Sequence, residues 1–233
     1  MLLDFALPAR CPACQAIVEQ LDGFCGDCWP QIEFLKGGCA TCGLPLEATE
    51  AELCAACLAS APLIDRTRSA VAYGDIARAL ALRLKYGRKV MLARTMARYM
   101  APLRDEWTHG AVLAPVPLHR WRIWGRGFNQ AALVADQLAT HWGLPVEHRL
   151  LARTKTTRSL KGLSHDQRRR AVQGAFQVTD PRLVEGRTVV LVDDVIASGA
   201  TADACARALK KAGAARVELV SWARVVRPAR FMR

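Results

Sequence analysis

Two adjacent carboxylates at the end of an apolar run are the side chains of this chain best placed to do chemistry. Residues 189–192 are continuously apolar and mostly β-branched, which is typical of a parallel strand buried on both faces. Asp193 and Asp194 follow at the carboxyl end of that strand, where open α/β sheets bind their ligands. These carboxylates suit the hydroxyl groups of a sugar, or a Mg²⁺ ion that takes further oxygens from the ligand.

A loop of five small residues follows the acid pair: Ala197, Ser198, Gly199, Ala200 and Thr201. Such a loop can turn tightly and present backbone N–H groups. Thr201 is the expected N-cap of a helix that runs to about residue 212 and stops at Gly213. Free amides and the positive end of a helix dipole attract phosphate, so the whole segment predicts a site for a phosphorylated sugar.

Eight of the nine cysteines form four C-x-x-C pairs: Cys11/Cys14, Cys25/Cys28, Cys39/Cys42 and Cys54/Cys57. Two such pairs supply the thiolates of one tetrahedral zinc site, so four pairs predict two sites. Three pairings are formally open; we prefer the pairing of sequence neighbours, which closes the shortest loops. It gives two similar modules, residues 11–28 and 39–57. Four thiolates leave no open position for a substrate, so the zinc is expected to be structural.

Redox-active pairs and an iron–sulfur cluster are the alternatives for these cysteines. Redox pairs of the thioredoxin type would need a βαβ context and would not occur four times. About sixty residues with few large apolar side chains would need the metal in order to fold. The ninth cysteine, Cys205, lies on the helix after the small-residue loop and is expected to fill the core.

The composition indicates a chain with one core and a smaller module. Of its 233 residues 52% are hydrophobic, and there is no run of about 18 apolar residues that would indicate a membrane span. The N-terminal sequence lacks a basic region and a long apolar core, so we expect no secretory signal and a cytoplasmic location. Residues 61–233 hold 31 basic and 13 acidic residues, a net charge of +18, which indicates anionic partners.

Periodicity predicts the elements that must position the acid pair. Residues 76–86 and 90–104 are expected to be amphipathic helices, 111–117 a strand ended by proline, and 129–142 a further helix. Residues 119–130 are expected to form a loop in which arginines alternate with aromatic residues: Arg120, Trp121, Arg122, Trp124, Arg126 and Phe128. This alternation is typical of single-strand nucleic-acid binding. The alternative is that the tryptophans pack into the core.

Two other nucleotide-binding motifs are excluded. Residues 189–194 also fit the Walker B strand of a nucleotidase, but its phosphate loop requires a Gly-Lys pair, which this chain does not contain. Gly125 and Gly127 hint at a dinucleotide fingerprint, but its last position is Gln130 and no acid sits suitably about 20 residues further on.

Residues 189–201 resemble the signature of the type I phosphoribosyltransferases. In that family the adjacent acids hold the ribose hydroxyls of phosphoribosyl diphosphate (PRPP), and the following loop wraps the 5′-phosphate. The resemblance implies that Asp193 and Asp194 are the catalytic ribose acids, that the loop from Ala197 to Thr201 binds the phosphate, and that Mg²⁺ accompanies PRPP.

The motifs PVPLHRWRIWGRGFNQ and Leu84-Lys85-Tyr86, with the cysteine pairs, make the chain similar to the ComF family over essentially its whole length. The resemblance implies a double zinc ribbon over residues 1–61. It further implies an α/β phosphoribosyltransferase domain, a parallel sheet flanked by helices, over residues 62–233. By analogy the turn at 115–117 lies where the diphosphate is held, with Lys85 and Arg126 as candidate cationic partners.

The family's competence role implies DNA uptake as the setting. Single-stranded DNA and a helicase or another DNA-processing protein are the implied partners. Two functions stay open: a PRPP-dependent transferase with an unknown acceptor, and a non-catalytic factor that binds nucleotides or single-stranded DNA.

The resemblance also implies that the basic stretch 154–174 is a mobile hood over the site, but Leu160 and Ala171 depart from the family pattern there.

Overall fold

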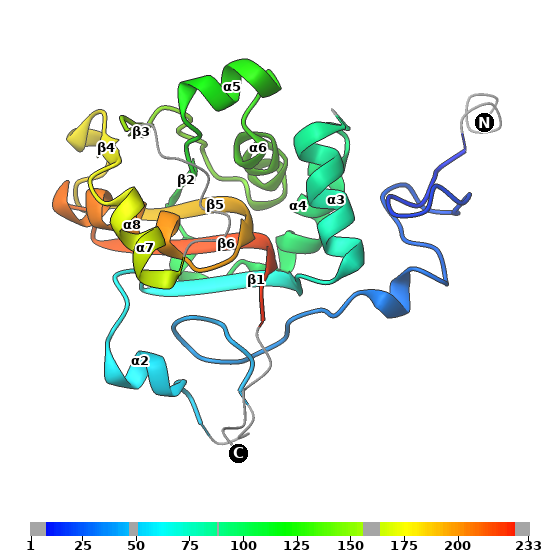
Figure 1. Ribbon diagram of the computed structural model, residues 1–233, viewed down its shortest axis with the longest axis horizontal. Helices are drawn as coiled ribbons and strands as arrows, with labels where there is room; N and C mark the ends of the chain where they lie inside the picture. Colours follow the sequence, from blue (N-terminus) through cyan, green and yellow to red (C-terminus); the bar gives the residue numbers. More distant parts are fainter. Residues whose placement is uncertain (1–7, 47–50, 88, 156–163, 227–233) are drawn as a thin grey trace.

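A four-stranded parallel sheet forms the centre of the computed structural model, which describes residues 8–46, 51–87, 89–155 and 164–226 (Figure 1). Its strands, in spatial order, are β1 (Arg66–Ala72), β6 (Arg216–Arg224), β5 (Thr188–Ile196) and β2 (Val112–Pro115). The backbone at Leu113 also pairs with residues 145–147 beyond β2. The predicted fold, a parallel sheet flanked by helices, is confirmed.

Helices cover both faces of the sheet because the side chains of β5 alternate between two cores. Val190 and Val192 pack into the core that contains α3 (Asp75–Tyr86), α4 (Leu92–Met100) and α6 (Gln130–Trp142). Val189 and Leu191 pack into the other core, beneath α8 (Ala200–Lys211), where Cys205 is fully buried as expected. A strand buried on both faces reads as a continuous apolar run, as the sequence of β5 does.

The remaining elements are short. A small antiparallel pair, β3 (Leu151–Arg153) and β4 (Phe176–Val178), brackets α7 (His165–Val172). Helix α5 (Arg120–Arg126) follows β2, and α2 (Ala55–Ala59) lies in the second cysteine module. The 3₁₀ helices are Trp29–Gln31, Ala101–Leu103, Glu106–Thr108 and Pro181–Leu183. Among the described residues, no helix combines the length and apolar character needed to cross a bilayer.

The prediction of a loop over residues 119–130 was wrong. Residues Arg120–Arg126 form a helix, α5, because the Nδ1 of His119 accepts a hydrogen bond from the Trp121 N–H and so caps its first turn. Gly127, with a φ of 85°, ends the helix in the left-handed conformation. The helix expected over 90–104 is shorter, since α4 gives way to a 3₁₀ turn at Ala101–Leu103.

The acid pair lies within β5, not after it, because the strand continues to Ile196. Ladder pairing with β6 extends that far, with Asp193 opposite Ser221 and Ile196 opposite Arg224. The expected N-cap at Thr201 was also wrong. Helix α8 begins at Ala200, since Gly199 takes a φ of 75° and makes the turn two residues earlier than a cap at Thr201 would.

The first cysteine module, residues 11–28, packs against α3 and α4. The Arg83 guanidinium donates to the carbonyls of Pro12 and Ala13 at 2.9 and 2.7 Å. The Asp22 carboxylate accepts from Arg94 at 2.6 Å and from the Thr95 hydroxyl at 2.9 Å. Charged and backbone contacts therefore join this module to the helical layer.

The second module, residues 39–57, lies against the edge strand β1 (Figure 1). The Thr67 N–H donates to the Thr41 carbonyl at 2.7 Å, and Arg68 donates to the Ala40 carbonyl at 2.9 Å. The packing is so close at Gly43 that a Cβ atom would lie 2.4 Å from the Thr67 carbonyl oxygen. The segment between the modules pairs with β1 as well, since Leu35 N–H donates to the Ala70 carbonyl. The exposed edge of the sheet is thereby covered.

Candidate functional site

The acid pair occupies the carboxyl-terminal part of β5, an interior strand flanked by β6 and β2. Asp194 is 6% exposed, and its Oδ2 lies 2.5 Å from the Nζ of Lys85, at the end of α3. The side chain of Asp193 points to the opposite face of β5, as neighbouring residues of a strand do. Its Oδ1 accepts a hydrogen bond of 2.8 Å from the Asp194 N–H. The structure therefore brings two of the predicted elements, the acid pair and Lys85, into direct contact.

Two neighbouring carboxylates in a dry environment cannot both be ionised at low cost. Burial and the charge of Asp194 together raise the pKa of Asp193 to about 8, against the opposing effect of Lys85. At neutral pH the pair therefore holds a proton that a bound cation would displace. The pair can serve as a set of oxygen ligands for a hard divalent ion or as acceptors for sugar hydroxyls.

A cavity of about 330 Å³ opens beside Asp193. The small-residue loop supplies half of its lining residues, which are Arg168, Asp193, Val195, Ile196, Ala197, Ser198, Gly199, Ala200, Thr201 and Ala202. In the part of the chain described, no side chain caps the first turn of α8. This twelve-residue helix directs the positive end of its dipole at the cavity, an arrangement that binds phosphate.

Arg168 is the lining residue that the sequence analysis did not single out. It comes from α7, which the capping box of Ser164 and Gln167 starts next to α8. The only sequence signal was its membership of the arginine run 168–170 in the hood stretch. Residues 156–163 of that stretch, including Leu160, lie outside the described residues, so the expected hood is described only at residues 154–155 and 164–174.

The turn at 115–117 lies next to the acid pair. Its Val116 N–H donates to the Val192 carbonyl at 2.9 Å, directly before Asp193. The Asn129 side chain, which caps α6, donates to the Val116 carbonyl at 3.0 Å. The asparagine of the RGFNQ motif therefore fixes the turn against the end of β5.

Arg126 lies beside the same end of α3 as Lys85. Its guanidinium donates to the Tyr86 hydroxyl at 3.2 Å and to the Gln130 side chain at 3.1 Å, and it lies 5.0 Å from the centre of the Tyr86 ring. Lys85 thus contacts the acid pair, while Arg126 is held by two neutral partners, one of them Tyr86, the residue after Lys85.

Helix α5 presents its aromatic side chains to solvent. Trp121 is 57% and Trp124 84% exposed, and their rings meet edge to face with centroids 5.8 Å apart. The Arg120 guanidinium lies 5.7 Å from the centre of the Trp121 ring. The alternative that these tryptophans pack into the core is therefore wrong.

The eight paired cysteines form two clusters: Cys11, Cys14, Cys25 and Cys28 in one, Cys39, Cys42, Cys54 and Cys57 in the other. Within each cluster the sulfur atoms lie within 4.8 Å of one another, and the preferred pairing of sequence neighbours is confirmed. A set of four thiols at this separation fits tetrahedral zinc, whose Zn–S bonds are about 2.3 Å long.

In each cluster backbone donors favour the thiolate of one cysteine, whereas burial and the neighbouring thiols raise the pKa of another, Cys28 or Cys57. Burial acts to raise the pKa of Cys39, but the N–H groups of Cys42 and Cys54 lower it to about 6. The first cluster has the same feature, since N–H groups of Cys14 and Cys25 lower the pKa of Cys11 to about 7 against the effect of burial. The thiolate is the form that binds metal, so both clusters suit a zinc ion.

Comparisons with known proteins match two different family models to this chain. Residues 2–58 match the model of the double zinc ribbon domain, and residues 125–229 match the phosphoribosyl transferase domain. Competence protein F of Haemophilus influenzae is 32% identical over 229 residues, which cover 95% of this chain and 93% of that protein. DNA utilization protein YhgH of Escherichia coli K12 is 32% identical over 204 residues, 84% of this chain and 88% of that protein. Competence protein ComFC of Bacillus subtilis is 34% identical over 104 residues, 45% of this chain and 40% of that protein.

The raised pKa of Asp193 predicts a pH-dependent stability. Between its usual value of 3.8 and about 8, the unfolded chain loses the Asp193 proton while the folded chain keeps it. The free energy of unfolding should therefore fall as pH rises from 5 to 7, by at most about 1.4 kcal/mol per pH unit. Asp193→Asn should remove this dependence in urea titrations at each pH. The control Asp180→Asn should keep it, because Arg182 lowers the pKa of Asp180. Identical slopes in wild type and Asp193→Asn would contradict the assignment.

The two clusters predict two zinc ions per chain. Cys14→Ser and Cys54→Ser should each leave one, because each removes a ligand from a different cluster. The matched control, Cys205→Ala, should keep both ions, since Cys205 belongs to neither cluster. Native mass spectrometry gives the count, and a zinc content near zero in the wild type would refute the two sites.

Proposed function

The chain belongs to the family of competence protein F and DNA utilization protein YhgH, whose phosphoribosyl transferase domain it carries; from this premise we propose that it binds PRPP with Mg²⁺ and transfers the phosphoribosyl group to an acceptor. One observation supports this above the others. The acid pair of β5, with Asp194 buried and Asp193 half-buried, lies beside a cavity walled by the small-residue loop at the start of α8. The carboxylate pair suits the hydroxyl groups of a ribose, and the adjacent anion site suits its phosphate.

Each group then has a defined role. The loop from Ala197 to Thr201 holds the 5′-phosphate through its N–H groups, and Arg168 adds a positive charge at the same cavity. Asp193 and Asp194 accept the ribose hydroxyls and are the oxygen donors that would hold Mg²⁺. That ion would supply positive charge to the departing diphosphate.

Positive charge on the leaving group comes also from the chain itself. Lys85 is bound to Asp194, and a cation entering the acid pair would release it toward the diphosphate. Arg126, which donates a hydrogen bond to Tyr86, the residue after Lys85, is the second candidate. In the transfer the bond from C1 of the ribose to the diphosphate oxygen breaks, and the acceptor forms the new bond to C1. The acid pair stabilises the cationic sugar between these events.

Single-stranded DNA binding is the second candidate function, and the exposure of Trp121 and Trp124 favours it. Bases can stack on aromatic side chains while arginines meet the phosphates. Together with the +18 charge of residues 61–233, α5 offers a surface for a strand. A helicase or another DNA-processing protein would be the partner in that setting, as the DNA-related names of the relatives suggest.

The acid pair is tested by calorimetric titration with Mg²⁺ and PRPP. Asp193→Asn combined with Asp194→Asn should weaken binding at least about a hundredfold, because both charged contacts to the ribose and the ion are lost. Asp180→Asn, which removes an exposed carboxylate outside the site, should bind as the wild type does. Equal affinity in the wild type and the double variant would refute the proposed site.

The single-strand surface is tested by a salt series with a fluorescent oligonucleotide. Trp121→Ala with Trp124→Ala should lower affinity at least about tenfold, since stacking contributes about 1–3 kcal/mol per base. Trp107→Ala is the matched control, because Trp107 is 54% exposed but lies on another surface. If the wild type has no affinity at about 50 mM salt, where electrostatic binding is strong, this second function is excluded.

A further inference from the structure

A second hollow adjoins the phosphate cavity on the side of the second cysteine module. Its volume is about 410 Å³, within the usual range of small-ligand sites. One wall comes from the module and the residues after it, including Cys42, Cys54 and Ala56, and the opposite wall comes from Ser198 and Gly199 of the phosphate loop. We call this hollow the module groove.

The module groove has an apolar floor and a cationic rim. Its floor includes the buried side chains of Ile64, Ile196 and Leu219. Its charged lining residues are Arg169, Arg207, Arg224 and a single acid, Asp203. Arg169 and Arg207 are exposed, so both can turn toward a ligand.

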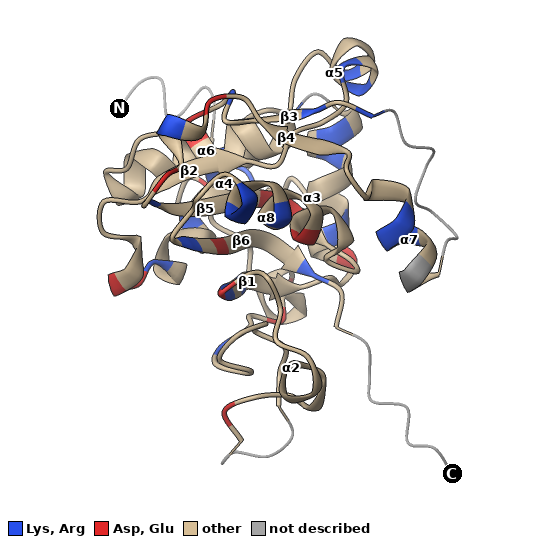
Figure 2. Cartoon of the chain, turned by 90° about the vertical axis from the view of Figure 1, so that its left-hand side faces the viewer, with Lys and Arg blue, Asp and Glu red and all other residues tan. Residues whose placement is uncertain are grey.

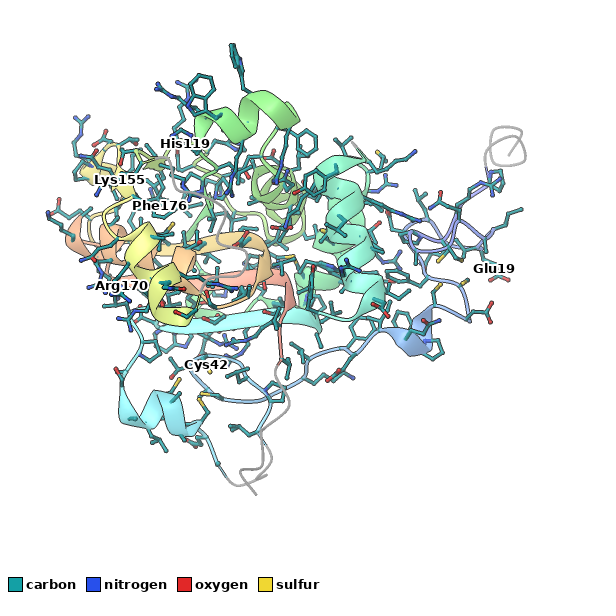
Figure 3. All side chains as sticks on the ribbon, in the orientation of Figure 1. Glu19, Cys42, His119, Lys155, Arg170 and Phe176 are labelled. Atoms are coloured by element: carbon teal, nitrogen blue, oxygen red, sulfur yellow. The ribbon has the colours of Figure 1, made fainter. Side chains whose placement is uncertain are left out.

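The second module fixes one side of this groove. Arg224 donates to the carbonyl oxygen of Cys42, and Arg68 holds the carbonyl of Ala40. Figure 3 shows Cys42 on one side of β1 and Arg170, on α7, on the other side. The module is therefore a rigid wall of a site next to the phosphate loop, in addition to being a cover for the edge of the sheet.

The positive surface continues from the groove along α7 and α8. A wider hollow of about 830 Å³ shares Arg169 and Arg207 with the module groove and adds Arg170 and Lys211. Figure 2 shows basic residues on both helices at this face. This positive surface would attract an anionic ligand towards the module groove.

We propose that the module groove binds a nucleotide, with its base on the apolar floor and its phosphate between Arg169 and Arg207. The planar guanidinium groups suit a phosphate, and the floor suits a flat heterocycle, which an acidic peptide does not offer. This site is separate from the acid pair and does not depend on PRPP binding. The nucleotide is either free or the end of a nucleic-acid strand, since both present the same chemistry.

The test uses zinc-loaded full-length protein and two probes, AMP and a 5′-phosphorylated oligonucleotide, in calorimetric titrations without PRPP. Arg169→Ala combined with Arg207→Ala should weaken AMP binding at least about tenfold, because two charged contacts are lost. Ala56→Trp, which places a large ring in the groove without changing charge, should do the same. Arg182→Ala is the matched control, since Arg182 is an exposed arginine outside the groove.

The acid-pair variant separates this proposal from the PRPP site. Asp193→Asn with Asp194→Asn should leave AMP affinity unchanged, whatever its effect on PRPP. Loss of AMP binding in that variant would place the nucleotide at the acid pair and overturn the proposal. Unchanged binding in both groove variants would overturn it too, as would an acidic peptide that binds as tightly as AMP.

The two probes distinguish the sources of the nucleotide. If the oligonucleotide binds more tightly than AMP and loses affinity in the same variants, the ligand is a strand end. If AMP binds at least as tightly as the oligonucleotide, the ligand is a free nucleotide.

Discussion

The site depends on keeping two adjacent carboxylates on an interior strand, where water reaches them poorly. Their repulsion is limited in two ways: Asp193 holds its proton to about pH 8, and Asp194 is paired with Lys85 at 2.5 Å. The surrounding elements enforce this arrangement. β6 and β2 fix the strand from both sides, and the turn at Val116 is hydrogen-bonded to the residue before the pair. A ligand that brings its own cation relieves the repulsion, which is why an anionic sugar with a divalent ion suits this place.

The cysteine modules support that arrangement from the outside. Neither is a free appendage, because arginines of the α/β domain bind their backbone carbonyls: Arg83 in the first module, Arg68 and Arg224 in the second. These contacts use backbone positions next to the sulfur ligands, so their geometry depends on each cluster being formed. Zinc bound at the two clusters would therefore stabilise the fold and, through the second module, also shape the surface beside the phosphate loop.

Much of this was predictable from the sequence, because local patterns carry it. The run before Asp193 predicted a buried strand, and the C-x-x-C spacing predicted both clusters with their pairing. Features that depend on neighbours were not predictable. The extension of β5 to Ile196 needs its partner β6, and the Lys85–Asp194 contact joins residues far apart in the chain. Helix α5 was missed because its cap is a histidine, an uncommon N-cap, and no apolar periodicity marks a helix that buries none of its residues.

The most direct measurement of the central claim is a crystal structure of the zinc-loaded protein soaked with Mg²⁺ and PRPP. The account predicts the 5′-phosphate on the N–H groups of the loop from Ala197 to Thr201 and the ribose hydroxyls against Asp193 and Asp194. It also predicts that Lys85 leaves Asp194 for the diphosphate. PRPP bound elsewhere, with the Lys85–Asp194 pair intact and the loop empty, would contradict it.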